Sequence, residues 1–144
     1  MTKTHQIAIP IFPDLQSLDA VGPGQVFGSA NQLLAREAYR IRFVATNPGP
    51  VATTAGFSLT ADSLRSVPAT SVDTLIVPGG DDKGVREALA DKQLMRWLKA
   101  AALNSTRACS VCSGAFLLAA TAVLDGRNAA THWSATADLQ RAFP

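Results

Sequence analysis

The 144-residue sequence is poor in the residues that metal sites and disulfide frameworks need. It has two cysteines and two histidines, at no spacing typical of metal ligands, so neither a metal site nor a cofactor is predicted. Two cysteines in an intracellular chain are expected to be reduced thiols. Cys109 and Cys112 have the C-x-x-C spacing of redox motifs, but three residues of strand span about 10 Å, whereas bridged Cα atoms lie within about 7 Å. Cys109 is therefore predicted as a core residue.

A concentration of charge of one sign is also lacking. The 13 basic and 11 acidic residues are interspersed along the chain and leave a net charge of +2, with no block of five or more like charges. Nucleic-acid-binding domains carry a concentrated basic patch, so direct contact between this chain and DNA is not predicted.

Long hydrophobic runs are missing as well. The longest apolar stretch, residues 108–124, contains Cys, Ser and Thr and is shorter than the ~20 residues of a membrane span. It is predicted as a buried strand followed by a helix, and no membrane partner is predicted. The N-terminus lacks the features of a signal peptide, because the short apolar segment at residues 5–10 runs straight into Pro13 and Asp14. A cytoplasmic location is therefore predicted.

The residues that are present favour one compact domain over residues 1–144, since 47% are hydrophobic and 17% are charged. Apolar and β-branched runs predict strands over residues 6–12, 39–45, 72–77 and 106–111, a hairpin over 51–64 around Gly56, and a short strand over 128–131. Helical spacing predicts a helix with Pro23 in its first turn that reaches residue 34, and further helices over 91–103, 113–124 and 134–142.

Strands that alternate with helices predict an α/β fold, in which a mainly parallel sheet is covered by helices on both faces. Ligands of such folds bind beyond the carboxyl ends of the strands. The loops after Phe12, Val77 and Val111 all lie at that edge of the predicted sheet, so we expect the functional residues there.

Residues 108–118 predict a strand, a sharp turn and a helix, which is the context of a nucleophile elbow. Backbone amides at the start of the following helix lower the pKa of a thiol at such a turn and can hold an oxyanion. Ser113 and Gly114 supply the small side chains that the crowded backbone requires. Cys112 is therefore the candidate nucleophile, and the alternative is a buried structural thiol.

Several motifs, in this order along the chain, resemble those of the ThiJ/PfpI superfamily, whose fold is shared with class I glutamine amidotransferases. The matching segments are residues 18–19 with 22–23, 75–80, 110–115, and 124–127 leading to 130–133. Within the superfamily, the sequence looks most like the N-terminal domain of AraC-type transcriptional regulators and next most like isonitrile hydratases. The resemblance implies a flavodoxin-like three-layer sandwich, and it implies that the resembled domain continues beyond Pro144, so that this chain is truncated at its C-terminus.

The resemblance also implies roles for two residues beside Cys112. Asp19 matches the acidic partner of the cysteine, and a nearby carboxyl group tunes a thiol by sharing its proton. The alternative is that Asp19 caps the helix that follows it. His132 follows Cys112 by 20 residues, as the family's histidine does, and would supply a general base; the alternative is an ordinary surface or core histidine.

Gly79 and Gly80 follow a strand at the same edge of the sheet, where glycine lets a backbone N–H approach a ligand closely. The resemblance implies that they form part of an oxyanion hole, and a tight turn is the simpler alternative. With Ser113 and Gly114 they are the predicted ligand-binding residues.

Two main functions follow from this resemblance. The first is an effector-sensing domain of an AraC-like regulator, a homodimer that binds a small metabolite near Cys112 and contacts DNA only through a C-terminal domain absent from this chain. The second is an enzyme that hydrates an isonitrile, or a related cysteine-dependent hydrolase or lyase. A third, a thiol-based stress protein, is disfavoured because those members resemble this pattern with glutamate in place of Asp19.

Overall fold

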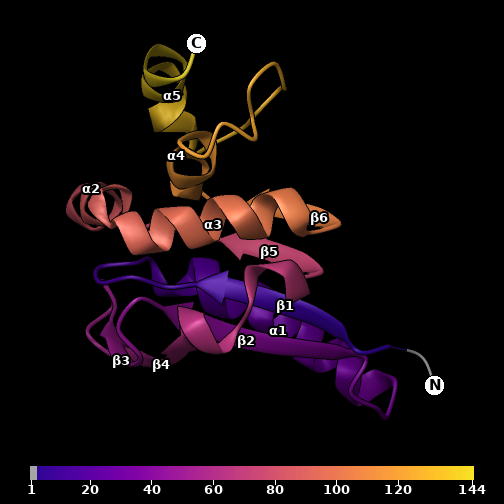
Figure 1. Ribbon diagram of the computed structural model, residues 1–144. Helices are drawn as coiled ribbons and strands as arrows, with labels where there is room; N and C mark the ends of the chain where they lie inside the picture. Colours follow the sequence, from indigo (N-terminus) through magenta and orange to yellow (C-terminus); the bar gives the residue numbers. More distant parts are fainter. Residues whose placement is uncertain (1–2) are drawn as a thin grey trace.

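A computed structural model describes residues 3–144 as a six-stranded sheet with helices on both faces (Figure 1). The strands are β1 (His5–Pro10), β2 (Tyr39–Ala45), β3 (Gly49–Ala52), β4 (Ser58–Ser63), β5 (Thr74–Val77) and β6 (Arg107–Ser110). The helices are α1 (Ser17–Leu33), α2 (Asp82–Ala90), α3 (Lys92–Asn104), α4 (Gly114–Ala119) and α5 (Thr136–Ala142), with short 3-10 turns at Leu64–Ser66, Ala69–Ser71 and Trp133–Ala135.

The sheet has the strand order β3-β4-β2-β1-β5-β6. All neighbouring strands are parallel except β3 and β4, which form the predicted hairpin around Gly56. The order reverses direction between β1 and β5, so the carboxyl ends of these two strands flank the crevice in which such folds bind ligands. The predicted α/β, flavodoxin-like fold with a mainly parallel sheet is confirmed.

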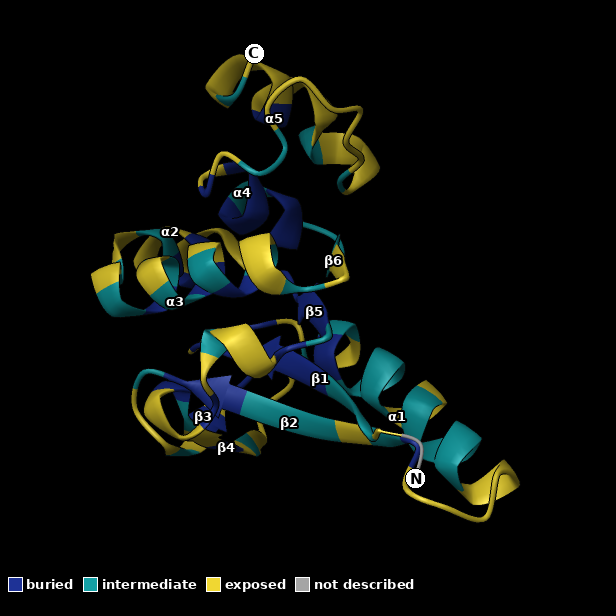
Figure 2. Cartoon of the chain, turned by 45° about the vertical axis from the view of Figure 1, so that its right-hand side comes forward, coloured by how far each residue is buried: buried dark blue, intermediate teal, exposed yellow. Residues whose placement is uncertain are grey.

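The core lies between the sheet and its covering helices. Ile7 and Ile9 of β1 and the whole of β5 are buried, as the predicted run of apolar residues in a central strand requires (Figure 2). On the helical side, α3 buries Leu94 and Leu98, and the indole of Trp97 donates a hydrogen bond of 2.8 Å to the carbonyl of Val67. These contacts fix the strands whose ends carry the candidate site.

The first helix begins earlier than the sequence predicted. The sequence predicted Pro23 in the first turn of this helix, but α1 starts at Ser17 and Pro23 is its seventh residue. A proline inside a helix has no N–H to donate to the carbonyl four residues before it, so one hydrogen bond is lost. The other hydrogen bonds of the 17-residue helix keep it continuous through Pro23. The earlier start places Asp19 in the first helical turn.

The region after β6 also differs from the prediction. Helix α4 ends at Ala119, not at residue 124, because Ala122 has a left-handed backbone (φ +67°) that cannot continue the helix. Residues 128–131 have no regular structure, so the predicted strand there is wrong.

Strand β6 is less buried than predicted because it lies at the edge of the sheet. Arg107 and Ala108 are exposed, and Cys109 is half-buried rather than a core residue. The outer side of an edge strand is covered only where another strand or a loop lies against it. No further strand of residues 3–144 pairs with the outer side of β6.

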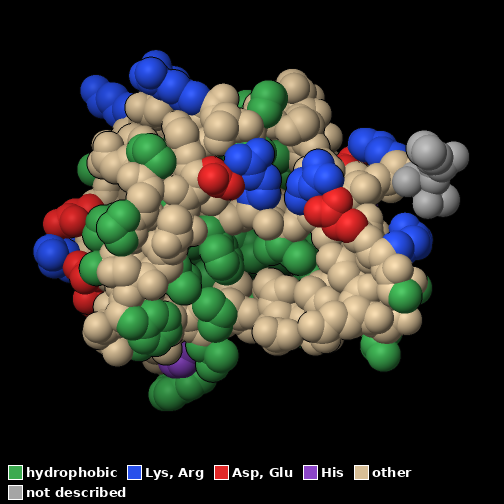
Figure 3. Space-filling model, turned by 90° about the horizontal axis from the view of Figure 1, so that it is seen from below, with side chains coloured by type: hydrophobic (Ala, Val, Ile, Leu, Met, Phe, Trp, Pro, Cys, Tyr) green, Lys and Arg blue, Asp and Glu red, His purple; other side chains and the backbone are tan. Residues whose placement is uncertain are grey.

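The surface carries charges of both signs close together. Figure 3 shows basic and acidic side chains side by side across the face seen from below. The ion pairs include Arg42 with Asp62 at 2.8 Å and Arg40 with Glu37 at 2.6 Å. The predicted lack of a concentrated basic patch agrees with this pairing.

Helix α4 packs on β5 at a point where only glycine fits. A Cβ atom on Gly114 would lie 2.1 Å from the carbonyl oxygen of Val77. We predict that Gly114→Ala lowers the free energy of unfolding by about 3 kcal/mol, because this backbone contact cannot relax. Gly28→Ala is the matched control: no atom lies within 4 Å of its Cβ position inside α1, and alanine there should stabilise by about 0.5–1 kcal/mol. Urea unfolding measures both changes, and an equal effect of the two substitutions would contradict the prediction.

Candidate functional site

The candidate site is formed by three chain segments that meet beyond the carboxyl ends of β1, β5 and β6. The first turn of α1 brings Asp19, the loop after β5 brings Gly79 and Gly80, and the turn after β6 brings Cys112 and Ser113. These five residues were predicted to lie at this edge, and the structure brings their segments together.

Asp19 is joined to the glycine loop. The N–H of Gly79 donates to Asp19 Oδ2 at 3.1 Å, and the carbonyl of Gly79 accepts from the N–H of Gln16 at 2.9 Å. The residue at the N-cap of α1 is Gln16, whose side chain makes no capping bond. The capping alternative for Asp19 is therefore wrong, since its carboxylate binds a loop 60 positions away in the chain.

Ser113 holds the second glycine. Its hydroxyl oxygen accepts from the N–H of Gly80 at 3.1 Å and donates to the carbonyl of the same residue at 3.1 Å. Both backbone N–H groups of the glycine pair thus have acceptors inside the protein. An N–H that donates to Asp19 or Ser113 is not free to hold an oxyanion unless that bond first breaks.

Gly79 has no room for a side chain. A Cβ atom there would lie 2.6 Å from Ser113 Oγ, 2.8 Å from the backbone nitrogen of Ser113 and 3.0 Å from Asp19 Oδ2. Real Cβ atoms do not approach other atoms so closely, so glycine is required where the acid and the turn converge.

Cys112 occupies a sharp turn between β6 and α4. Its φ of +52° lies in the left-handed region, which is unfavourable for a residue with a Cβ atom. Flanking hydrogen bonds hold the turn: the N–H of Val111 donates to Val77 at 2.9 Å, and the N–H of Gly114 donates to Val111 at 2.9 Å. The thiol is half-buried and unpaired, so the prediction that Cys109 and Cys112 form no disulfide is confirmed.

His132 is less closely engaged than the predicted general base. Its ring lies against Trp133, and its Nδ1 lies 2.8 Å from the hydroxyl oxygen of Ser134. Among residues 3–144, no hydrogen bond joins its ring to Cys112. The charge of His132 nevertheless lowers the pKa of the Asp19 carboxyl group.

The surroundings of Asp19 raise its pKa. Burial raises the pKa of Asp19 above the ordinary value of 3.8, and the hydrogen bond from Gly79 and the charge of His132 lower it by smaller amounts. A carboxyl group in this setting can hold a proton beside the turn that carries the thiol.

Thr131 contacts the site although it was not among the predicted site residues. Its hydroxyl donates to the carbonyl of Cys112 at 3.0 Å and so ties the segment before His132 to the turn. The only sequence signal was its place in the 130–133 motif, directly before the histidine.

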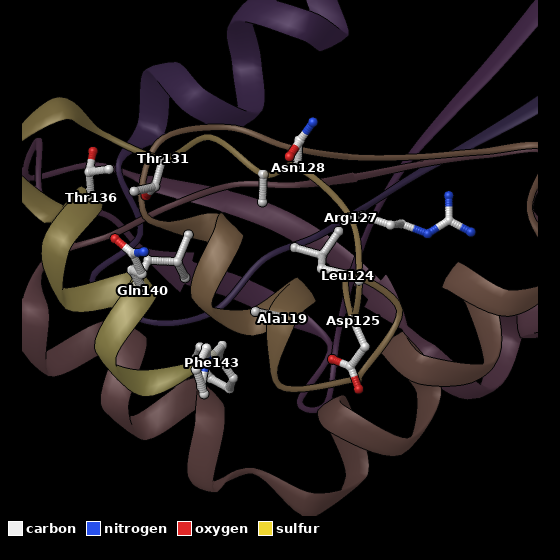
Figure 4. A pocket seen from close by; sticks show the side chains of 13 residues that line it. Ala119, Leu124, Asp125, Arg127, Asn128, Thr131, Thr136, Gln140 and Phe143 are labelled. Carbon is white, nitrogen blue, oxygen red and sulfur yellow. The ribbon is translucent and has the colours of Figure 1, made fainter.

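A cavity of about 350 Å³ lies beside this threonine, between the end of α4, residues 124–131 and α5 (Figure 4). Its floor is apolar, formed by Ala119, Leu124 and Phe143, and the Arg127 side chain extends away from the others in Figure 4. Cys112 and Asp19 do not line it. The cavity is therefore a neighbour of the candidate site and not part of it.

The comparisons with known proteins agree on one family. The model of the DJ-1/PfpI family matches residues 5–143. The uncharacterized protein of the cpoL 5′ region of Streptomyces lividans is 38% identical over 144 residues, which are 97% of this chain and 96% of that protein. Isonitrile hydratase of Pseudomonas putida is 30% identical over 130 residues, 90% of this chain and 53% of the enzyme. The HTH-type transcriptional regulator GbdR of Pseudomonas aeruginosa is 34% identical over 116 residues, 80% of this chain and 30% of the regulator.

Solved structures show the same fold. A THiJ/PfpI family protein from Pseudomonas syringae matches with a TM-score of 0.85 and 29% identity, over 96% of this chain and 54% of that one. An AraC family transcriptional regulator from Pseudomonas putida matches with a TM-score of 0.76 and 19% identity, over 95% of this chain and 71% of that one. Apart from the Streptomyces protein, these relatives are longer than the part that the chain spans.

Residues 3–144 contain neither a membrane-spanning helix nor a cluster of metal-ligating side chains. No helix in this range has the length and apolar character needed to cross a membrane. No group of three or more His, Cys, Asp or Glu side chains in the same range is placed to hold a metal ion.

A carboxyl-carbon NMR titration tests the environment of Asp19. We expect Asp19 to titrate above 3.8 and Asp73, whose pKa is lowered by bonds from Gln6 and Lys3, to titrate below it. His132→Ala should raise the pKa of Asp19 further, because a positive charge is removed. Folding raises this pKa, so the stability that the group contributes falls as pH rises from its unfolded through its folded value. An Asp19 midpoint at or below 3.8 would contradict the assignment.

The two thiols provide a second test. Both are half-buried, so exposure alone predicts similar reactivity. We expect limiting iodoacetamide near neutral pH to alkylate Cys112 much faster than Cys109, because Cys112 lies in the turn that leads into α4, whereas Cys109 lies within β6. Mass spectrometry of the peptides measures the ratio, and equal labelling would remove Cys112 from the site.

Proposed function

We propose that this chain, which belongs to the DJ-1/PfpI family, is the effector-sensing domain of an AraC-type transcriptional regulator. It binds a small metabolite at the site formed by Cys112, Asp19 and Gly80. In this proposal the cysteine is a recognition group, and the chain keeps the scaffold of an enzyme without its turnover.

The observation that carries the proposal is the engagement of the glycine amides. Gly79 donates to Asp19 and Gly80 donates to Ser113, whereas a catalyst needs such donors aimed at the charge that develops in the transition state. His132 also makes no hydrogen bond to Cys112 among the described residues, so a general base is not in place. A sensor needs neither; it needs a ligand that binds one of two conformations more tightly than the other.

The relatives support the same reading. GbdR and GlxA of Rhizobium meliloti, both described as HTH-type transcriptional regulators, are 34% and 31% identical to this chain. The chain spans 30% and 35% of their lengths, so contact with DNA would belong to a part of such a regulator outside this sequence. The mixed charges of the described surface fit that division of roles.

A cysteine-dependent isonitrile hydratase is the second candidate. The 30% identity to the Pseudomonas putida enzyme supports it, although the chain spans 53% of that protein. The structural observation in its favour is that Asp19 and Ser113, the residue after Cys112, meet at Gly79, so a carboxyl group lies near the turn that carries the thiol and could exchange a proton with a reacting group there.

Three further features are part of the proposal. Residues 1–144 act as one domain, the protein is a homodimer, and it works in the cytoplasm, where its two thiols stay reduced.

Turnover separates the two candidates. We expect the chain to convert simple isonitriles to formamides no faster than its Cys112→Ala variant, as measured by chromatography of the product. Turnover well above that variant, abolished also by Asp19→Ala, would establish the hydratase and overturn the sensor. Such an outcome would mean that the glycine amides or His132 rearrange when substrate binds.

A further inference from the structure

We propose that Thr131 is a positioning residue: its hydroxyl fixes the peptide unit between Cys112 and Ser113 and thereby aims the N–H of Ser113 into the site. This inference rests on the proposed role of Cys112. In this role Thr131 orients the N–H of Ser113, a backbone donor that no other contact among residues 3–144 uses.

The geometry of a peptide unit supplies the first step. The unit is planar, and no cis peptide bond occurs among the described residues, so the carbonyl of Cys112 and the N–H of Ser113 point in opposite directions. The hydroxyl of Thr131 donates to that carbonyl at 3.0 Å. A bond that fixes the direction of the Cys112 carbonyl therefore also fixes the direction of the Ser113 N–H.

The backbone nitrogen of Ser113 lies among the site residues. The nitrogen of Ser113 lies 2.8 Å, and Asp19 Oδ2 3.0 Å, from the point where a Cβ of Gly79 would be, so both border the same narrow space. No acceptor is bonded to this N–H among residues 3–144, whereas the N–H groups of Gly79 and Gly80 each have one. Ser113 thus carries the free backbone donor next to the thiol.

The turn requires such a restraint. Cys112 has a φ of +52°, which a residue with a Cβ atom leaves readily unless its surroundings hold it. The other bond to the Cys112 carbonyl, from the N–H of Ala115, is long at 3.5 Å. The shorter bond from Thr131 is therefore the main restraint on this carbonyl.

Thr131 itself is anchored by little else. Residues 128–131 have no regular structure, and within residues 3–144 its bond to Cys112 is the one hydrogen bond that joins this segment to another part of the chain. The same threonine borders the cavity next to α5. Its hydroxyl therefore couples the position of the segment that carries His132 to the conformation at Cys112.

Two substitutions separate the hydroxyl from the shape of the side chain. Thr131→Val keeps the volume and removes the donor, and Thr131→Ser keeps the donor. The measurement is the rate of iodoacetamide labelling of Cys112 as a function of pH, with Cys109 as the internal reference. We expect Thr131→Val to slow labelling of Cys112 by about fivefold at neutral pH, because the N–H of Ser113 is then no longer held beside the thiol. Thr131→Ser should retain the wild-type profile.

The outcomes are distinguishable. An unchanged profile for Thr131→Val, or a Thr131→Ser variant as slow as Thr131→Val, overturns the role of the hydroxyl while wild-type Cys112 still reacts faster than Cys109. Equal rates for the two cysteines in the wild-type protein instead overturn the proposed site. If Thr131→Val fails to fold, adding Cys112→Gly to that variant should restore folding, because glycine adopts a positive φ without cost. A double variant that still fails to fold would overturn the inference.

Discussion

The candidate site depends on the close approach of three chain segments around Gly79, where no side chain fits. Ser113 and Asp19 both border the point where a Cβ atom of that residue would lie. The hydrogen bonds of Gly79 and Gly80 to these two side chains then lock the loop after β5 to the start of α1 and to the turn after β6. The rest of the architecture serves this junction: the parallel sheet aligns the strand ends, and Gly114 lets α4 start directly against β5.

Those hydrogen bonds also determine which functions the fold can support. The amides of Gly79 and Gly80, which could stabilise a developing negative charge, are used to hold the protein's own side chains, whereas the N–H of Ser113 has no acceptor among residues 3–144. A site built this way is held in place by its own contacts, and burial raises the pKa of the Asp19 carboxyl group within it. Recognition of a small polar molecule fits such a site better than catalysis, which is why the regulator proposal is preferred over the hydratase.

Much of this could be predicted from the sequence, because it rests on local patterns. Buried runs such as 72–77 read as central strands, and the glycines after Val77 and the small residues after Cys112 mark the crowded edge of the sheet. What escaped prediction depends on contacts across the chain. Pro23 suggested a helix that starts near that residue, whereas α1 starts six residues earlier at Ser17. The exposure of β6 follows from its place at the edge of the sheet. Thr131 could not be found because its partner is a backbone carbonyl, which leaves no mark in the sequence.

The bond between Asp19 and Gly79 spans 60 positions of the chain, and the bonds between Gly80 and Ser113 span 33. No short peptide from this protein contains the site, so the chain must close long loops before any of its chemistry exists. During synthesis Asp19 stays an ordinary carboxyl group until β5 has emerged and paired with β1. The candidate site is therefore formed late in folding, and a chain that misassembles its sheet would lack the site even where each of its residues is intact.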